Sequence, residues 1–549
     1  MNPLSRRTAL QLAAVTGTGL AAASVAGPAA AAPPSSRRMF GHGVASGDPL
    51  PTAVVLWTRV TPTAASTPGS GVGPAVTVGW EVATDPRFRR IVRRGSARTG
   101  PDRDHTVKID AGGLSPATTY WYRFTAGGTT SPVGRTRTAP APSARPARLR
   151  MAVVSCANLQ AGWFTAYRHL AARQDLDVVV HLGDYLYEYA PGEYQARDVV
   201  VRPHDPAHEM VTLADYRRRH AQYKTDPDLQ ALHALAPWVI TWDDHESAND
   251  AWSGGAENHT EGAEGAWAAR RAASQQAYAE WMPVRYTAGG RLYRRLRFGR
   301  LASLSMLDLR TYRDRQASSM VDPALDDPDR TLAGPEQLDF LLDGLADPDV
   351  QWKLVGNPVM IAPVRFPSTL DGDALRGIAT LLDAPVSPSG VPYNVDQWDG
   401  YPAERARVLG HLRDRGITDA VFLTGDIHSG WAAELPADAS TYPATGDSVG
   451  VELVCSSVTS DNLDDILGTP PRTTSLAAET GIRANNPHIK YVDLDSHGFS
   501  VLEVTPAGVQ MDWFVLVDRT HPDSGAVWST SFRVPAGSGR VEPAPRRLA

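Results

Sequence analysis

Apolar residues follow two different periods along this chain, one typical of strands and the other of helices. Between about Phe40 and Thr138, short runs alternate apolar with polar side chains and are separated by turn residues, which predicts an all-β region. Its expected strands are residues 53–58, 76–82, 106–109 and 119–124. This pattern favours a small fibronectin- or immunoglobulin-like β-sandwich over residues 40–138.

A proline-rich segment, residues 139–149, follows and predicts a stiff linker. Beyond it strands and helices alternate, which predicts a layered α/β (α+β) domain over residues 150–535, with β-sheets sandwiched by helices. Expected helices are 164–173, 213–223, 228–236, 263–282, 335–346 and 401–415, and a hairpin is expected at 499–504 and 509–514. The loops 187–212, 314–332, 362–400 and 456–490 are candidate lids, and residues 536–549 are predicted to form a flexible tail.

Composition narrows the class of protein without naming a function. A chain of 549 residues with 42% hydrophobic and 21% charged residues is typical of a globular protein with more than one domain. The formal net charge of −6 argues against a polyanion-binding face, so no nucleic acid is expected as a partner.

The first residues predict an export signal. Arg6 and Arg7 form a twin arginine, and residues 10–25 are apolar but too short and too weakly hydrophobic to favour a membrane anchor. Cleavage is expected among Ala29 to Ala32, so residues 1–32 would be removed. We therefore expect a secreted protein that uses the twin-arginine export machinery as a partner and acts as a monomer.

Side chains with metal-binding chemistry come directly after the predicted buried strands of the second domain. The carboxyl ends of parallel strands meet at one edge of a sheet, so these groups are expected to lie together and to form a polynuclear metal site. They are Cys156, Asp184, Tyr187, the run Asp243-Asp244-His245-Glu246, Asn357, Asp426 and His428.

The donor types indicate which metals would bind. A tyrosine phenolate beside Asp184 favours a trivalent ion such as Fe(III), and the Asn357 amide oxygen suits a hard cation such as Ca²⁺. Burying the run after Trp242 without a cation would be costly, and His245 is free to donate a proton or to contact phosphate. Asn249 either orients His245 or is solvated.

The chain has two cysteines, Cys156 and Cys455. In an exported protein the simplest reading is one disulfide. The alternative, which we favour, is that Cys156 is a metal thiolate, because it ends the first strand of the series, while Cys455 is a buried apolar residue.

Taken together, the motifs Gly183-Asp184-x-x-Tyr187, Trp242–Glu246 and Gly425-Asp426-Ile427-His428 resemble those of the calcineurin-like metallophosphoesterases. The cysteine before them and the segment 486–493 are similar to the alkaline phosphatase D (PhoD) family, which includes a secreted Streptomyces enzyme with phospholipase D activity. The resemblance runs from about residue 40 to about residue 518.

This resemblance implies a site that holds Fe(III) and Ca²⁺. The iron would be surrounded by Cys156, Asp184, Tyr187 and His428. Asp184 would bridge to the calcium, whose other ligands would be Asp244, Asn357 and Asp426. The sequence leaves open whether Asp243 exchanges roles with Asp244.

The expected function is a secreted, metal-dependent phosphoric ester hydrolase like alkaline phosphatase. Metal-bound hydroxide would attack phosphorus and His245 would protonate the leaving oxygen. Substrates would be small phosphate esters; the alternative is a phospholipase D-like phosphodiesterase acting on phospholipids, and a more distant one is a non-catalytic surface-binding protein. Arg310 would either contact phosphate or pair with Asp308 or Asp314.

Overall fold

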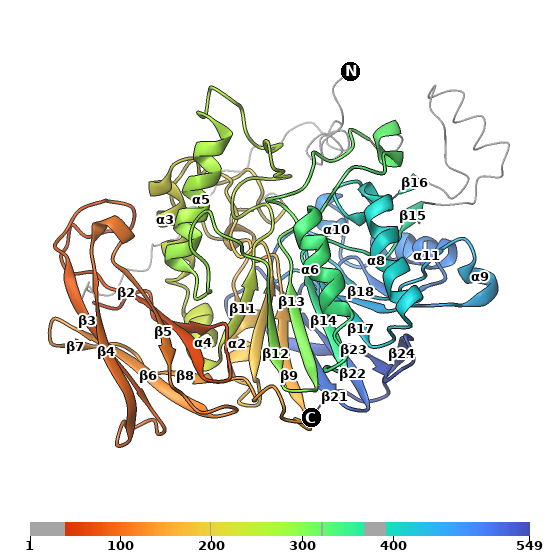
Figure 1. Cartoon of the computed structure of the whole chain (residues 1–549). Helices are drawn as coiled ribbons and strands as arrows, with labels where there is room; N and C mark the ends of the chain where they lie inside the picture. Colours follow the sequence, from red (N-terminus) through yellow and green to blue (C-terminus); the bar gives the residue numbers. More distant parts are fainter. Residues whose placement is uncertain (1–38, 198, 320–321, 367–390, 393, 549) are drawn as a thin grey trace.

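The structure is a computed structural model that describes residues 39–197, 199–319, 322–366, 391–392 and 394–548. The predicted leader, residues 1–32, and most of the predicted loop at 362–400 lie outside the described residues. Two large sheets pack face to face at the centre of the molecule (Figure 1).

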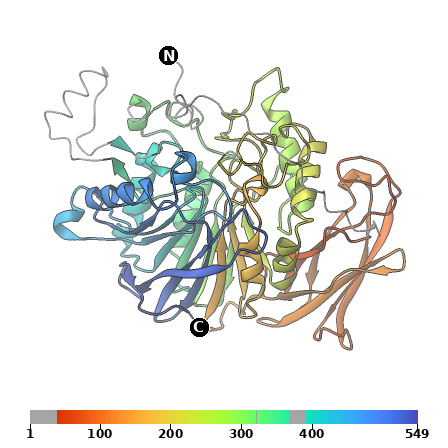
Figure 2. The ribbon, with the colours of Figure 1, turned by 180° about the vertical axis from the view of Figure 1, so that it is seen from behind.

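The first sheet has ten strands in the order β24-β23-β22-β21-β9-β10-β11-β1-β2-β5. At its centre β9, β10 and β11 are parallel neighbours. From behind, the C-terminal strands continue this sheet beside β9 (Figure 2). Its strands are β1 (Val44–Gly47), β2 (Ala53–Arg59), β5 (Thr106–Gly112), β9 (Leu149–Val154), β10 (Val178–Leu182), β11 (Trp238–Thr241), β21 (Gly498–Thr505), β22 (Gly508–Leu516), β23 (Ala526–Pro535) and β24 (Glu542–Pro543).

The second sheet has seven strands in the order β12-β13-β14-β17-β19-β18-β20. Apolar side chains from both sheets, including Val180, Leu304 and Leu423, form one buried cluster between them. The strands are β12 (Arg294–Phe298), β13 (Ala302–Met306), β14 (Trp352–Asn357), β17 (Ala420–Thr424), β18 (Gly430–Glu434), β19 (Val451–Val454) and β20 (Ile489–Asp493).

Helices cover the outer faces of both sheets, as the alternation of strands and helices predicts. Against the first sheet pack α2 (Thr165–Ala171), α3 (Leu213–Tyr223), α4 (Pro227–Leu235) and α5 (Trp267–Trp281). Against the second pack α6 (Pro335–Leu345), α8 (Pro402–Arg415) and α11 (Thr474–Asn485). Because α11 falls inside the predicted loop 456–490, that prediction is wrong for this part of the loop.

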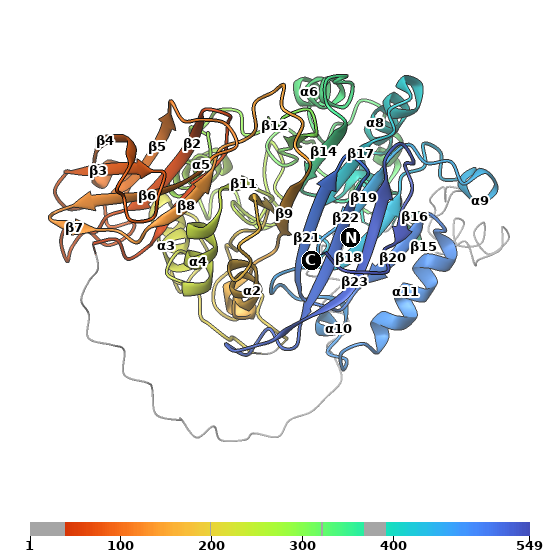
Figure 3. The same ribbon diagram turned by 90° about the horizontal axis from the view of Figure 1, so that it is seen from below.

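The N-terminal lobe is a β-sandwich, but its two sheets are not both its own. One is a five-stranded sheet of β4 (Ile91–Thr99), β3 (Val76–Ala83), β6 (Thr119–Ala126), β7 (Thr129–Thr130) and β8 (Gly134–Arg137). The other consists of β1, β2 and β5, which extend the ten-stranded sheet because β1 pairs in parallel with β11. The lobe therefore shares a sheet with the layered domain (Figure 3).

The last residues also differ from the prediction of a flexible tail. Strand β24 pairs with β23, and the side chains of Val541 and Ala544 are buried. The backbone amide of Leu548 donates to Asp512. Residues 536–548 thus pack onto the sheet, because two apolar side chains and a buried carboxylate give them partners there.

Candidate metal and catalytic site

The predicted site residues lie where neighbouring strands of the two sheets end. Cys156 follows β9, Asp184 follows β10, and Asp243 and Asp244 follow β11. From the second sheet, β14 ends at Asn357 and β17 precedes the segment with Asp426 and His428, and these two strands are parallel neighbours. The strand ends thus bring side chains from positions almost three hundred residues apart to one place.

Four of these residues adopt left-handed backbone conformations. The φ angles are 59° at Cys156, 55° at Asp184, 61° at Asp426 and 55° at His428. Such a conformation costs a non-glycine residue about 1–3 kcal/mol, and it is concentrated at functional sites where the surrounding structure holds it. Each of these turns leaves its strand sharply and directs the side chain into the space between the sheet edges.

The first donor group contains Cys156, Asp184 and His428, whose candidate ligand atoms lie within 4.8 Å of one another. The Tyr187 hydroxyl joins them, at 2.9 Å from Asp184 Oδ2 and 3.3 Å from His428 Nε2. The structure therefore brings together the thiol, carboxylate, phenol and imidazole that the sequence predicts around one ion.

The protonation of this group suits a cation. Burial raises the pKa of the Cys156 thiol well above its usual value, and the nearby Asp184 carboxylate raises it further. Burial and Asp184 raise the pKa of Tyr187 in the same way. Asp184 Oδ1 is buried and accepts no hydrogen bond from any residue that the structure describes. A metal ion would supply the missing partner and would stabilise the thiolate and phenolate, so the residues present fit a metal.

The second donor group is made of four aspartates, Asp184, Asp243, Asp244 and Asp426, again with candidate ligand atoms within 4.8 Å. Asp184 belongs to both groups. The four carboxylates are buried, which is costly without positive charge nearby.

Part of that positive charge comes from Arg310, which the sequence did not place in the site. Its guanidinium donates to both carboxylate oxygens of Asp243 and, at 2.9 Å, to Asp396. Among the described residues its guanidinium forms no ion pair with Asp308 or Asp314, the two carboxylates that the sequence offered as alternatives to phosphate. Asp308 accepts a hydrogen bond from the backbone amide of Arg310. Asp243 and Arg310 are 67 positions apart, so no local pattern connects them.

Asn357 is buried beside the site, but its amide is engaged elsewhere. The amide oxygen accepts a hydrogen bond of 3.0 Å from the indole of Trp398. The amide nitrogen donates to the carbonyl of Val359 and to the hydroxyl of Thr424. The oxygen keeps one lone pair with which it could contact a cation.

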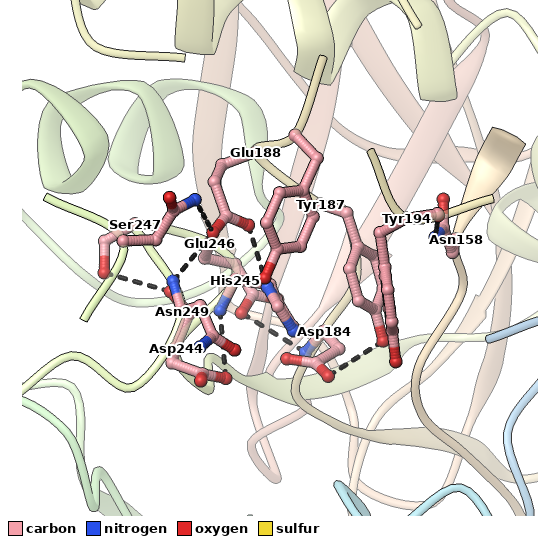
Figure 4. Close-up of polar contacts among 12 residues, drawn as sticks. Asn158, Asp184, Tyr187, Glu188, Tyr194, Asp244, His245, Glu246, Ser247 and Asn249 are labelled. Atoms are coloured by element: carbon pink, nitrogen blue, oxygen red, sulfur yellow. Dashed lines mark hydrogen bonds and ion pairs between the residues drawn. The ribbon is translucent and has the colours of Figure 1, made fainter. Parts of the chain in front are cut away.

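His245 is held by Glu188, a residue that sequence reasoning missed. His245 Nδ1 lies 2.8 Å from Glu188 Oε2, and the ring packs against Tyr187 with 4.1 Å between ring centroids. Figure 4 shows the imidazole between Glu188 and Asp184. Burial alone would lower the pKa of His245, but Glu188, Asp244 and Asp184 raise it well above its ordinary value. The signal for Glu188 was its position directly after Tyr187.

Asn249 supports this arrangement through its backbone. Its amide nitrogen donates to Glu188 Oε1 at 2.7 Å, while its side chain donates to Glu257. The side chain of Asn258 donates to the same oxygen of Glu188. Asn249 thus orients His245 indirectly, by holding Glu188.

A cavity of about 300 Å³ opens onto these residues and reaches His245, Asp426 and His428. One wall is apolar and the rest of the lining is aromatic or polar. The apolar wall consists of Ile427, Leu463, Ile466 and Leu494. The cavity is large enough for an organic group attached to a phosphate.

The two cysteines are free thiols in the structure, which excludes the disulfide reading. The Ser155 hydroxyl lies between them, 3.2 Å from Cys156 Sγ and 3.4 Å from Cys455 Sγ. Cys455 is buried in the cluster between the two sheets, as an apolar residue would be.

Comparison with known proteins identifies relatives of the whole chain. The family model described as "PhoD-like phosphatase" matches residues 151–513, and that of its N-terminal domain matches residues 25–140. Alkaline phosphatase D of Bacillus subtilis (strain 168) is 39% identical over 513 residues, which cover 91% of this chain and 82% of that protein. A solved structure described as "Structure of PhoD" superposes with a TM-score of 0.82 at 37% identity and covers 94% of each chain.

The fold and the matches define a phosphatase, a hydrolase of phosphoric esters. Within that class, the chain belongs to the PhoD-like phosphatase family. This confirms the resemblance on which the sequence analysis relied.

Proposed function

We propose that this protein is a secreted, metal-dependent phosphoric ester hydrolase of the alkaline phosphatase D type, with phosphomonoesters as its main substrates. The observation that carries the proposal is the meeting of two donor groups at one shared carboxylate, Asp184, beside a cavity lined by His245. Two cations sharing a carboxylate is the usual way to hold a transferring phosphoryl group.

Fe(III) fits the first donor group, because Cys156 and Tyr187 are anionic donors once deprotonated and His428 completes the set with Asp184. Ca²⁺ fits the second, in which Asp244 and Asp426 offer oxygen and Asn357 lies close by. When bound, such cations would polarise the phosphoryl oxygens and lower the pKa of a coordinated water.

The residues of the chain would supply the remaining proton transfer. Glu188 accepts from Nδ1 of His245 and so keeps a proton on that atom, which directs Nε2 away from Glu188. A protonated His245 can then give its Nε2 proton to the leaving oxygen of the ester. The raised pKa of His245 favours this acidic role.

A second candidate function is the hydrolysis of phosphodiesters, including phospholipid head groups. It is favoured by the apolar wall of the cavity, where Leu463, Ile466 and Leu494 could pack against a second ester substituent. Both functions would use the same cations and the same His245.

The export route and the monomeric state belong to the proposal as well. The twin arginine and the apolar segment after it support export, although they lie outside the described residues. Among the residues that the structure describes, no helix is long and apolar enough to cross a membrane.

The decisive test compares kcat/KM for a phosphomonoester and a matched phosphodiester, with Ca²⁺ and after treatment with a chelator. Metal content is measured on the same samples. Cys156→Ser should lose iron and activity, whereas Cys455→Ser, the control at the other buried thiol, should keep both. Activity that survives complete removal of metal would contradict the proposal.

A further inference from the structure

A dense group of exposed arginines lies on one strand of the N-terminal lobe and the turn before it. Six arginines fall between positions 87 and 98, and no acidic residue interrupts them. They are Arg87, Arg89, Arg90, Arg93, Arg94 and Arg98, and all are exposed. The negative net charge of the whole chain conceals this local positive patch.

The patch occupies β4, which ends the five-stranded sheet and pairs with β3. Figures 1 and 3 place β4 at the outer side of the N-terminal lobe. By strand alternation Arg94 and Arg98 share one face, and the turn before β4 adds Arg89 and Arg90. Among the described residues, no carboxylate oxygen lies within 4 Å of a guanidinium nitrogen of these six arginines. The guanidinium of Arg93 donates to backbone carbonyls.

Two exposed aliphatic side chains interrupt the arginines. Ile91 and Val92 keep 38% and 37% of their surface in contact with solvent. An arginine or two would be enough to keep an edge strand from pairing with another chain. Six arginines around two aliphatic residues exceed that need, and this combination is typical of proteins that bind the interface of an anionic membrane.

We propose that β4 and its preceding turn form a docking surface for an anionic lipid membrane, with the arginines contacting lipid phosphates and Ile91 and Val92 entering the interface. The choice of a lipid surface over a soluble polyanion rests on the two aliphatic residues, because a polyanion offers them nothing to pack against. The surface lies outside the catalytic site, so the proposal does not depend on which ester the site hydrolyses.

The test measures partition of the mature protein into vesicles of neutral phosphatidylcholine and into vesicles with 30% phosphatidylglycerol, at low and high salt. We expect clear preference for the anionic vesicles that salt abolishes. The patch variant Arg89→Gln/Arg94→Gln/Arg98→Gln should bind them about a hundred-fold more weakly, from roughly five-fold per arginine. The control variant Arg407→Gln/Arg415→Gln/Arg483→Gln removes the same charge from exposed sites on α8 and α11 and should bind normally.

A second variant separates lipid from polymer. Ile91→Ser/Val92→Ser should weaken binding to anionic vesicles but leave any binding to long-chain polyphosphate unchanged. Equal partition into both kinds of vesicle, or equal behaviour of the patch and control variants, would overturn the proposal. The proposal would also be overturned if the protein bound polyphosphate as tightly as anionic vesicles and Ile91→Ser/Val92→Ser did not weaken binding to the vesicles. Circular dichroism and hydrolysis of a soluble ester check that each variant is folded.

Discussion

Arg310 holds Asp243 in a two-pronged ion pair inside the acidic site, with Nη2 2.9 Å from Oδ2 and Nε bonded to Oδ1. Both side chains are buried. The adjacent Asp244 lies farther from the guanidinium, at 3.7 Å. Arg310 therefore satisfies both oxygens of Asp243, whereas those of Asp244 accept from the backbone amides of His245 and Asp250.

Removal of Arg310 should destabilise the protein strongly. In Arg310→Met, Asp243 would remain buried without its cation, whereas Asp396 would keep its ion pair with Arg313 at 2.7 Å. The unpaired Asp243 costs about 3–5 kcal/mol in the free energy of unfolding. Urea denaturation of chelator-treated protein measures this loss. Asp243→Asn in the same chain should recover part of it, and Arg413→Met, at an exposed ion pair with Asp414, should change little. If Arg310→Met and Arg413→Met behave alike, the ion pair does not stabilise the site.

The two neighbouring aspartates should differ in their effect on metal content. Because Arg310 occupies both oxygens of Asp243, we expect Asp244→Asn to lose Ca²⁺ and Asp243→Asn to retain most of it. Elemental analysis of the purified variants decides between them, with calcium titration as a check on affinity. Loss of calcium in Asp243→Asn alone would show that the two residues have exchanged roles.

The proton-donor role of His245 predicts a dependence on the leaving group. His245→Gln should lower kcat by roughly 10²–10⁴-fold for an alkyl phosphate, whose leaving oxygen needs a proton. For p-nitrophenyl phosphate the loss should be much smaller, because nitrophenolate leaves unprotonated. Glu188→Gln should show the same trend more weakly, since it acts by holding His245. An equal loss on both substrates would contradict a proton-donor role.

Buried neutral histidines predict a loss of stability in acid. Burial lowers the pKa of His42 and of His181 to about 3, and that of His488 to about 4. The unfolded chain binds protons at these sites below a pH of about 6.5, whereas the folded protein does not. Stability is therefore full above that pH and falls below it, by about 1.4 kcal/mol per group and about 4 kcal/mol for the three between pH 7.5 and 5.5.

Urea denaturation at these two pH values, with chelator present, measures the difference for the whole protein, and single substitutions isolate the contribution of each histidine. His181→Gln should reduce the difference by about one group's share, while a substitution of the exposed His521 should not alter it. If the free energy of unfolding changes between the two pH values by the same amount in His181→Gln as in the unaltered chain, the pKa of His181 is not lowered in the folded protein.

Strand ends were the part of the site that the sequence could predict. Cys156, Asp184, Tyr187 and His428 each follow an apolar run, and the fold brings such ends together whatever the intervening loops do. The roles of these residues as ligands remain predictions. Glu188 and Arg310 escaped notice because their importance comes from contacts with His245 and Asp243, across 57 and 67 positions.

The fold was predictable to a similar degree. Helices with a clear apolar period, such as 213–223, were confirmed at α3 with the same bounds. Strand β4 was missed because arginines occupy positions where a half-buried strand would alternate apolar residues. Sharing of a sheet between β1 and β11 could not be predicted either, because pairing between strands almost two hundred residues apart leaves no local signal.

That pairing has a consequence for how the chain can be assembled during synthesis. At one end of the parallel group β9-β10-β11, strand β11 borders β1, which emerges from the ribosome far earlier. At the other end, β9 borders β21, which emerges near the end of synthesis. Strand β1 is therefore made long before its partner β11. Strand β9 remains unpaired on one side until about residue 500 has been made. Because so many contacts join distant positions, the turns that carry Cys156 and Asp184 become fixed only once nearly the whole polypeptide has been released. The layered domain that holds the candidate site would therefore not form in a chain that is still being synthesised.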